Sequence, residues 1–215
     1  YSGGFMLEKC CHDIDFYSLV VGCRPIKVAS FGGRGSFIPE NSPALNGEEN
    51  LDIYKEYNLE GWESKEQVFD SDADIVDHQV AIIEYENGAT LAFHTNMKVP
   101  DEFRRFAIIG TKGMAEGDFV RGYLKAHNSH TGEKIFDENF GAAFQQGTKG
   151  HYGADQLMVK DINNYLLDES NHFLPVGVVD CMEAGLVAMK IDESRVKNQI
   201  IDLRDMWNKL DSYSL

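Results

Sequence analysis

Ionisable side chains gather at the start of the chain, where Glu8, Lys9, His12, Asp13 and Asp15 open an otherwise apolar segment. If this segment is helical, Glu8 and His12 stand four residues apart on one face. There a carboxylate can hydrogen-bond an imidazole or share a substrate with it. The spacing predicts an acid/base pair with Glu8 and His12 as catalytic residues. Lys9, which lies between them, is a candidate substrate-binding residue.

Each of these residues also has a structural alternative. Glu8 and His12 can form a helix-surface pair that stabilises the fold by about 0.2–0.5 kcal/mol. Lys9 can simply be solvated, as most helix lysines are. Cys10 and Cys11 are expected to be core thiols, and no metal site is predicted because suitably spaced further ligands cannot be named.

A second polar cluster is formed by His151 and Asp155, again four residues apart, where a glycine-rich turn leads into a helix. Gly147, Gly150 and Gly153 would let a polar ligand approach the backbone closely. We therefore treat His151 and Asp155 as candidate substrate-binding residues. The alternative is that Asp155 only stabilises the first helical turn through the helix dipole.

The first helix should run from Gly3-Gly4 to Gly22, because both ends carry helix-boundary signals and Pro25 follows. A strand is expected over 26–31, and the polar passage 35–62 is long enough to form a lid. The clearest signal is a hairpin of 75–86 and 89–99 around Asn87-Gly88, a pair suited to a type I′ turn. In its second strand, Leu91 and Phe93 alternate with polar residues that include His94, which predicts one buried and one open sheet face.

Further strands are predicted over 104–109, 113–119, 123–127 and 134–137, and amphipathic helices over 154–167 and 179–195. The stripe of the first of these helices consists of Val159, Ile162 and Leu166. Both helices are expected to cover the apolar face of the sheet. The predicted fold class is α+β, with a large, mostly antiparallel, open-faced sheet whose helices cover one face.

Composition limits the classes of partner. The chain has 215 residues, of which 43% are hydrophobic, and 20 basic against 35 acidic residues give a formal net charge of −15. Such a balance repels phosphate backbones and anionic membranes, so neither nucleic acid nor a membrane is an expected partner. The four cysteines form no C-x-x-C pair or secreted disulfide framework, which favours the cytoplasm.

No dinucleotide-binding motif is recognisable. The glycine clusters at 32–35 and 110–117 do not read G-x-G-x-x-G, and no strand, glycine turn, helix and acidic residue follow at the required spacing. The chain also starts at Tyr1-Ser2 without an initiator Met. We therefore expect it to be a fragment or a processed product of a longer protein.

The chain resembles the Gfo/Idh/MocA family of sugar and inositol dehydrogenases. Their second domain begins with a glycine-rich helix that carries D-x-x-x-H followed by D-I-D, and here the stretch 8–15 reads E-x-x-x-H-D-I-D. The similarity continues through segments that span nearly the whole chain, at 25–28, 77–80, 110–113, 150–155 and 192–194. The family more often has Asp at the position of Glu8.

The resemblance implies an NAD- or NADP-dependent oxidoreductase in the intact protein. Residues 1–215 would be its substrate-binding and oligomerisation domain, with the N-terminal Rossmann domain absent from this chain. His12 would exchange the proton of the reacting hydroxyl of a sugar, inositol or related polyol while hydride passes to or from the nicotinamide, and Glu8 would orient His12 or bind a neighbouring hydroxyl. No cofactor should bind tightly to this chain alone, and the open sheet face should form a homodimer or homotetramer.

A non-catalytic alternative remains open. A descendant of the same family could bind a sugar as a sensor or serve protein assembly, because a fold does not fix a function. The intact E-x-x-x-H pair favours the enzyme. A glycine-rich loop and a lysine motif in the preceding sequence would distinguish the two.

Overall fold

The computed structural model describes residues 3–42, 69–141, 153–167, 174 and 176–213. The chain divides into two compact units, of which the first comprises residues 1–98 and 176–215 and the second residues 99–175. Each unit contains one antiparallel four-stranded sheet.

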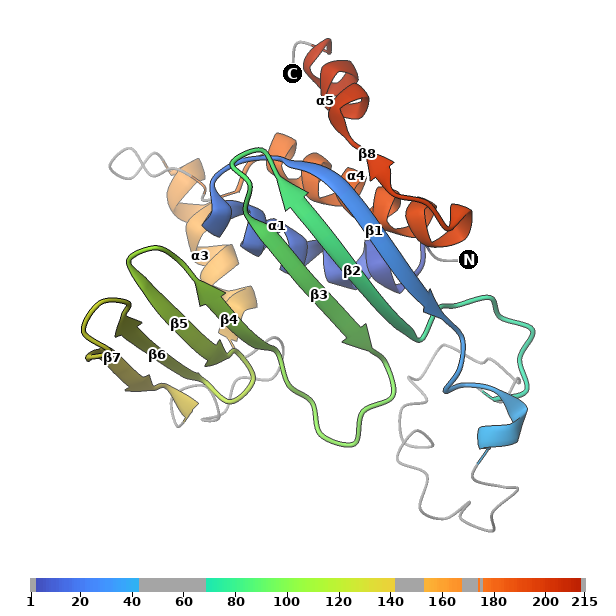
Figure 1. The fold of residues 1–215 in the computed structure, drawn as a ribbon, viewed down its shortest axis with the longest axis horizontal. Helices are drawn as coiled ribbons and strands as arrows, with labels where there is room; N and C mark the ends of the chain where they lie inside the picture. The colour runs from blue at the N-terminus through green and yellow to red at the C-terminus, as the bar shows by residue number, and fades with distance from the viewer. Residues whose placement is uncertain (1–2, 43–68, 142–152, 168–173, 175, 214–215) are drawn as a thin grey trace. The chain divides into compact units, whose positions relative to one another are not determined.

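The sheet of the first unit has the strand order β3-β2-β1-β8, and the helices α1 and α4 lie on one of its faces (Figure 1). The elements of this unit are β1 (Pro25–Gly33), β2 (His78–Tyr85), β3 (Thr90–Asn96), β8 (Ile201–Asp202), α1 (Cys11–Val21), α4 (Val178–Lys197) and α5 (Arg204–Asp211). Among the described residues of this unit, no helix lies on the other face of the sheet (Figure 1). This arrangement produces one covered and one open face.

The core of the first unit lies between this sheet and its helices. Residues of β2 alternate between buried and exposed or half-buried, as expected for a strand with one covered face. The buried cluster joins the N-terminal helical segment, β2 and α4 through Met6, Cys10, Ile14, Ala81, Ile83, Tyr85, Val187, Ala188 and Ile191. Burial of a large apolar side chain stabilises a fold by about 1.5–3 kcal/mol, so this stripe fixes the helix to the sheet.

The N-terminal helix is not one regular α-helix. It begins with a π-helical turn over Met6–Cys10 and becomes α-helical only at Cys11. Gly4 precedes the turn with a φ of 87°, a conformation that glycine adopts readily. Because π-turns bond residue i to i+5, the prediction of a single α-helix from Gly3-Gly4 is corrected at its first turn.

The hairpin is confirmed, but its turn is not type I′. Type I′ requires a positive φ at both central residues, and Gly88 has φ 82° whereas Asn87 has no positive φ. The amide of Gly88 instead bonds the Tyr85 carbonyl, which makes a turn over 85–88 that ends in a left-handed glycine. Asn87 uses its side chain to accept a hydrogen bond from Ala89, so its preference for the turn is explained by side-chain bonding.

The second unit contains the sheet β4-β5-β6-β7. Its elements are β4 (Arg105–Ile109), β5 (Gly113–Asp118), β6 (Tyr123–Asn128), β7 (Lys134–Asn139) and α3 (Ala154–Leu166).

Asp118 is buried at the end of β5, where it accepts hydrogen bonds from the amides of Arg104, Val120 and Arg121. Burial would raise the pKa of Asp118, but the Arg121 guanidinium and these amides outweigh it and lower the pKa.

The α+β class and the antiparallel pairing are confirmed, and the strands prove to be divided between two sheets. The prediction that the apolar stripe of helix 154–167 is buried is wrong. No residue of α3 is buried, and Val159, Ile162 and Leu166 are exposed. A helical period identifies an apolar stripe but not the surface that covers it. Of the predicted lid over 35–62, residues 39–41 form a short 3₁₀ turn, and the part beyond residue 42 lies outside the described residues.

Candidate functional site

The predicted acid/base helix displays its three candidate residues to the outside. Glu8, Lys9 and His12 are exposed, whereas Met6 and Cys10 of the same turns are buried. Packing of the apolar stripe against the sheet thus determines which face of the helix is presented. The three residues that the sequence selected lie on the face available to a ligand.

Glu8 and His12 do not form a hydrogen-bonded pair. The carboxylate of Glu8 turns toward the start of the helix and accepts a hydrogen bond from the amide of Gly3 at 2.5 Å. Among the described residues, no hydrogen bond joins Glu8 to His12. The π-turn contributes to this outcome, since residues four apart are no longer aligned when a turn closes at the fifth residue.

His12 interacts electrostatically with Asp15, which lies three residues further along the helix. The pKa of Asp15 is raised because burial disfavours its charged form, and the neighbouring Asp180 adds to the effect. His12 partly offsets this shift. His12 therefore interacts electrostatically with Asp15 rather than through the predicted contact with Glu8.

A cavity of about 340 Å³ lies at the N-terminal end of this helix. Its lining includes residues at the start of the N-terminal helix, in β2 and near the end of α4. These are Gly3, Gly4, Phe5, Gln79, Asp192 and Arg195. Because Phe5 and Met6 line the cavity, the helix that carries the predicted acid/base residues begins at its wall.

Gln79, Asp192 and Arg195 form a connected polar wall. The Nε2 of Gln79 donates to Oδ1 of Asp192 at 3.2 Å and to the hydroxyl of Ser30 at 3.0 Å. Nε of Arg195 reaches the same Asp192 oxygen at 3.3 Å. The sequence reasoning did not single out Gln79 or Arg195, although Gln79 and Asp192 lie in segments that carry the family resemblance.

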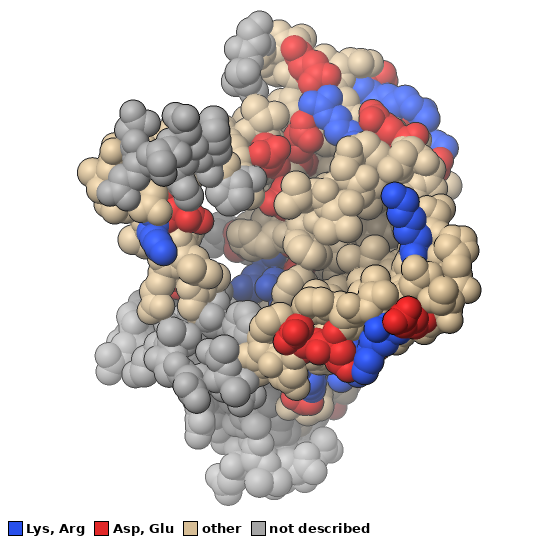
Figure 2. All heavy atoms as spheres, turned by 90° about the vertical axis from the view of Figure 1, so that its left-hand side faces the viewer, with Lys and Arg blue, Asp and Glu red and all other residues tan. Residues whose placement is uncertain are grey.

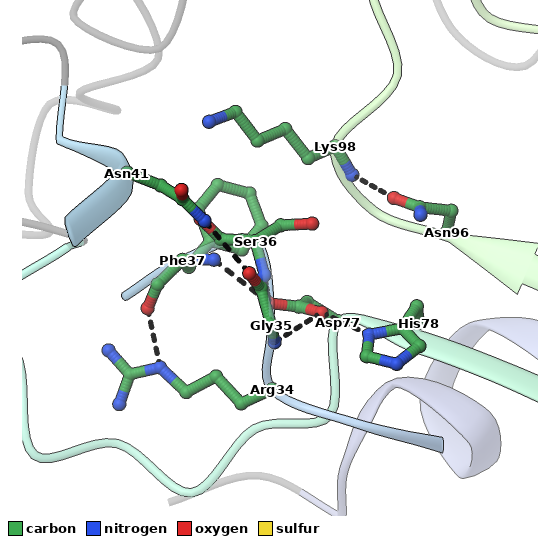
Figure 3. Close-up of polar contacts among 9 residues, drawn as sticks. All are labelled: Arg34, Gly35, Ser36, Phe37, Asn41, Asp77, His78, Asn96 and Lys98. Atoms are coloured by element: carbon green, nitrogen blue, oxygen red, sulfur yellow. Dashed lines mark hydrogen bonds and ion pairs between the residues drawn. The ribbon is translucent and has the colours of Figure 1, made fainter. Parts of the chain in front are cut away.

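A second polar centre surrounds Asp77, whose side chain is fully buried (Figure 3). Its carboxylate accepts hydrogen bonds from the amides of Gly35, Ser36 and Phe37 at 2.7–3.0 Å. The same carboxylate lies 2.8 Å from Nδ1 of His78. Asp77 therefore fixes the loop after β1 against the start of β2.

The charge state of Asp77 determines the tautomer of His78. Burial would raise the pKa of Asp77, but the hydrogen bonds from His78 and from the loop amides outweigh it and lower the pKa to about 2. An ionised carboxylate can only accept hydrogen bonds, so Nδ1 of His78 must carry the proton. The Nε2 atom of this half-exposed ring is left as an acceptor in the neutral form.

The second predicted cluster is described only in part. Asp155 is exposed in the first turn of α3, which follows Gly153 with a φ of 91°, and belongs to the second unit. His151 lies outside the described residues. The proximity of the two residues therefore stays a prediction.

The described residues contain no parallel βαβ unit. Every strand pair in them is antiparallel, whereas the usual nucleotide site needs a parallel βαβ unit with a glycine-rich turn. In the same residues, no group of three or more His, Cys, Asp or Glu side chains could hold a metal ion. No helix among them has the length and apolar character needed to cross a bilayer.

The surface charges are mixed rather than separated. On the face drawn in Figure 2, Lys and Arg lie scattered beside Asp and Glu and do not gather into one basic patch. With a formal net charge of −15, this distribution offers little to attract a phosphate backbone.

Comparison with known proteins places these features in context. Residues 1–116 match the model of the GFO/IDH/MocA C-terminal domain. A protein of Bacillus subtilis (strain 168) named "Putative oxidoreductase YteT" is 24% identical, in an alignment that covers 75% of this chain and 47% of that protein.

Solved structures share the fold at low identity. Levoglucosan dehydrogenase in complex with NADH has a TM-score of 0.66 at 15% identity, covering 94% of this chain and 50% of the dehydrogenase. The aldose-aldose oxidoreductase of Caulobacter crescentus complexed with glycerol has a TM-score of 0.58 at 14% identity, covering 94% of this chain and 48% of that chain.

The chain spans about half the length of these relatives. The family model covers more than half of the chain and includes the complete N-terminal helix with Glu8 and His12. The chain therefore belongs to the Gfo/Idh/MocA family of oxidoreductases, in which it corresponds to the C-terminal domain.

Proposed function

We propose that residues 1–215 are the substrate-binding and oligomerisation domain of an NAD(P)-dependent oxidoreductase that acts on a sugar, inositol or related polyol. The observation that carries this proposal is the exposure of Glu8, Lys9 and His12 on a helix whose opposite stripe is buried. The names of the structural relatives, which include a levoglucosan dehydrogenase complexed with NADH and levoglucosan, support the substrate class.

His12 is assigned the proton transfer. In the oxidation direction its imidazole accepts the proton of the reacting hydroxyl, and in reduction it returns that proton. A positioned general acid/base contributes about 10²–10⁴-fold to the rate. Asp15 lies within electrostatic range of His12, which lowers the raised pKa of Asp15.

Glu8 and Lys9 are assigned to positioning and to substrate contact. The bond from the Gly3 amide holds one oxygen of Glu8 at the helix start, so Glu8 orders the turn that precedes His12. Lys9 is exposed beside it and can donate to a substrate hydroxyl. His151 and Asp155 are retained as candidate contacts for a more distant part of the substrate.

No residue of this chain is assigned to the nicotinamide cofactor. We propose that a Rossmann domain elsewhere in the intact protein holds NAD or NADP, and that this chain alone is inactive. Titrating the 215-residue chain with NADH while following nicotinamide fluorescence should show no micromolar binding. Binding of that strength would refute the assignment of the cofactor to another domain.

The four free cysteines support a cytoplasmic location.

The open sheet face is proposed as the surface for a homodimer or homotetramer. Phe31, Val80 and Ile82 are 65%, 48% and 55% exposed and lie on neighbouring strands, with Phe31 directly opposite Val80. Apolar side chains that meet on an open face favour association.

The test of the catalytic assignment is the substitution His12→Ala in the intact protein. Turnover should fall by at least about 100-fold while NAD(H) affinity is unchanged, because only the proton transfer is removed. His130→Ala, at an exposed turn of the second unit, is the matched control and should leave turnover unaltered. Near-normal turnover in His12→Ala would refute the assignment and favour a non-catalytic module.

A further inference from the structure

We infer that the cavity beside Gly3 and Gly4 is a subsite for a neutral polyol, and that Gln79, Asp192 and Arg195 recognise its hydroxyl groups. The inference rests on the proposed function, which supplies the polyol as the class of substrate. It adds a location, a set of recognition residues outside the predicted acid/base helix, and a preference for neutral over anionic ligands.

Gln79 presents an amide oxygen that has no hydrogen-bond partner among the described residues. The residue is 3% exposed, and its Nε2 faces Asp192 and the Ser30 hydroxyl. Ser30 donates its own proton to the carbonyl of Val80, and the Asp192 oxygen can only accept, so the amide nitrogen must be the atom directed at both. Oε1 consequently points away from them, and among the described residues no donor reaches it. A buried carbonyl oxygen without a donor costs about 1–3 kcal/mol, which a bound hydroxyl would recover.

Arg195 presents donors in the same cavity. Its side chain is only 23% exposed, and its Nε is engaged with Asp192. In the part of the chain that the structure describes, neither terminal guanidinium nitrogen of Arg195 donates a hydrogen bond. A guanidinium that lines a cavity with these nitrogens unused is suited to bind ligand oxygens in a fixed geometry.

Asp192 adds an acceptor close to the turn. Among the described residues, both hydrogen bonds to its side chain use Oδ1. The other oxygen, Oδ2, lies on the side of Gly4, 3.9 Å from where a Cβ on that residue would stand. The wall therefore offers acceptors on Gln79 and Asp192 beside donors on Arg195.

This alternation fits adjacent hydroxyl groups. Each hydroxyl has one proton to donate and lone pairs to accept with, so two neighbouring hydroxyls can give protons to Gln79 or Asp192 while accepting from Arg195. Phe5 and Met6 line the same cavity and supply apolar surface for the C–H groups of a ring. A polyol uses both kinds of surface.

Local charge favours a neutral ligand. Two carboxylates, Asp74 and Asp192, line the cavity with a single guanidinium, that of Arg195. Asp192 already partners Arg195, and among the described residues no cation is paired with Asp74, so an anionic ligand would meet a second carboxylate there. A sugar acid should therefore bind more weakly than the corresponding neutral polyol.

The test is a calorimetric titration of the 215-residue chain with myo-inositol as the probe and D-glucuronate as the anionic comparison. Arg195→Met should weaken inositol binding by at least about tenfold, since it removes charged hydrogen-bond donors. Arg195→Lys keeps the charge beside Asp192 but loses the planar fork, so it should also weaken binding. Arg204→Met is the matched control, because Arg204 is paired with Asp202 outside the cavity and is 54% exposed.

The parent chain should bind inositol in preference to glucuronate. Three results would overturn the inference: no inositol binding by the parent chain, unchanged binding in both Arg195 variants, or glucuronate bound as tightly as inositol. Circular dichroism of each variant identifies loss of fold, and Arg195→Lys serves as the deciding variant if Arg195→Met does not fold.

Turnover of the intact protein separates this inference from the proposed function. Arg195→Lys should raise KM for the polyol with little change in kcat, whereas His12→Ala should lower kcat. If His12→Ala retains turnover but inositol still binds through Arg195, the catalytic assignment fails and the subsite stands. If His12→Ala loses turnover and the Arg195 variants keep a normal KM, the subsite fails and the catalytic assignment stands.

Discussion

The amide of Gly3 donates a hydrogen bond to the carboxylate of Glu8 at 2.5 Å, and this contact links the predicted acid/base helix to the cavity that Gly3 lines. A carboxylate at this position also interacts favourably with the unpaired amides of the first helical turn. Glu8 therefore has a structural task at the helix start in addition to any contact with substrate.

Glu8→Gln and Glu8→Ala should separate these roles in the intact protein. Gln retains an oxygen that can accept from Gly3, so kcat should fall by less than about tenfold if Glu8 acts by positioning the turn. Glu8→Ala removes the acceptor and should lower kcat further. Steady-state kinetics of the two variants measure the difference, and equal losses in both would instead assign the effect to the negative charge of Glu8.

Local signals in the sequence predicted most elements because their causes are local. The alternation in 89–99 and the apolar run after His12 correspond to β3 and α1. The π-turn at Met6–Cys10 could not be predicted, since it arises from how the helix packs at its first turn. The short strand β8 also escaped detection, because its two residues pair with β1 over a long sequence separation.

The candidate site was predictable in composition but not in geometry. The motif identified Glu8 and His12, yet the direction of the Glu8 carboxylate depends on Gly3 and on the π-turn. Arg195 escaped notice because it lies near the end of α4 and reaches the cavity only through the tertiary fold. A late helical arginine has no local feature that distinguishes it from a solvated one.

Asp77→Asn should destabilise the first unit by about 2 kcal/mol, the equivalent of lowering the pKa from 3.8 to about 2. In the parent, the backbone amides of the loop after β1 all donate to the Asp77 carboxylate. In the variant, the NH₂ group of Asn, itself a donor, faces these donors. Urea unfolding at pH 7 measures the loss, and Asp72→Asn at an exposed neighbouring position is the control. A variant as stable as the parent would show that the loop amides are equally well satisfied by water.

The contribution of Asp77 should also depend on pH with a defined sign. Its pKa is lower in the folded than in the unfolded chain, so the stabilisation is present above an ordinary pKa of 3.8 and is lost as the pH falls toward about 2. The difference in unfolding free energy between the parent and Asp77→Asn should therefore shrink over this interval. A constant difference across the interval would contradict the ionised state assigned to Asp77.

Asp15 should show the opposite behaviour. Burial and the nearby Asp180 raise its pKa, so the folded state disfavours the charged form and loses stability above the ordinary value of 3.8. Asp15→Asn should raise the free energy of unfolding at pH 7 slightly, and the gain should disappear at pH values below 3.8. Because His12 offsets part of this shift, the gain should be larger in a His12→Ala background. A double-mutant cycle measures this coupling, and additive effects would contradict an interaction between His12 and Asp15.

Ile82→Asp should separate the proposed oligomer into smaller species without unfolding it. Ile82 is 55% exposed on the open face of the first sheet, so a charge there adds no buried carboxylate to the monomer but would have to be desolvated in an interface. Light scattering of the intact protein in physiological salt should show a lower mass for the variant than for the parent. Ile109→Asp is the matched control, because Ile109 is 81% exposed on β4 of the second sheet and should leave the mass unchanged. A parent that is monomeric at high micromolar concentration, or an Ile82→Asp variant of unchanged mass, would exclude the open face of the first sheet as the interface.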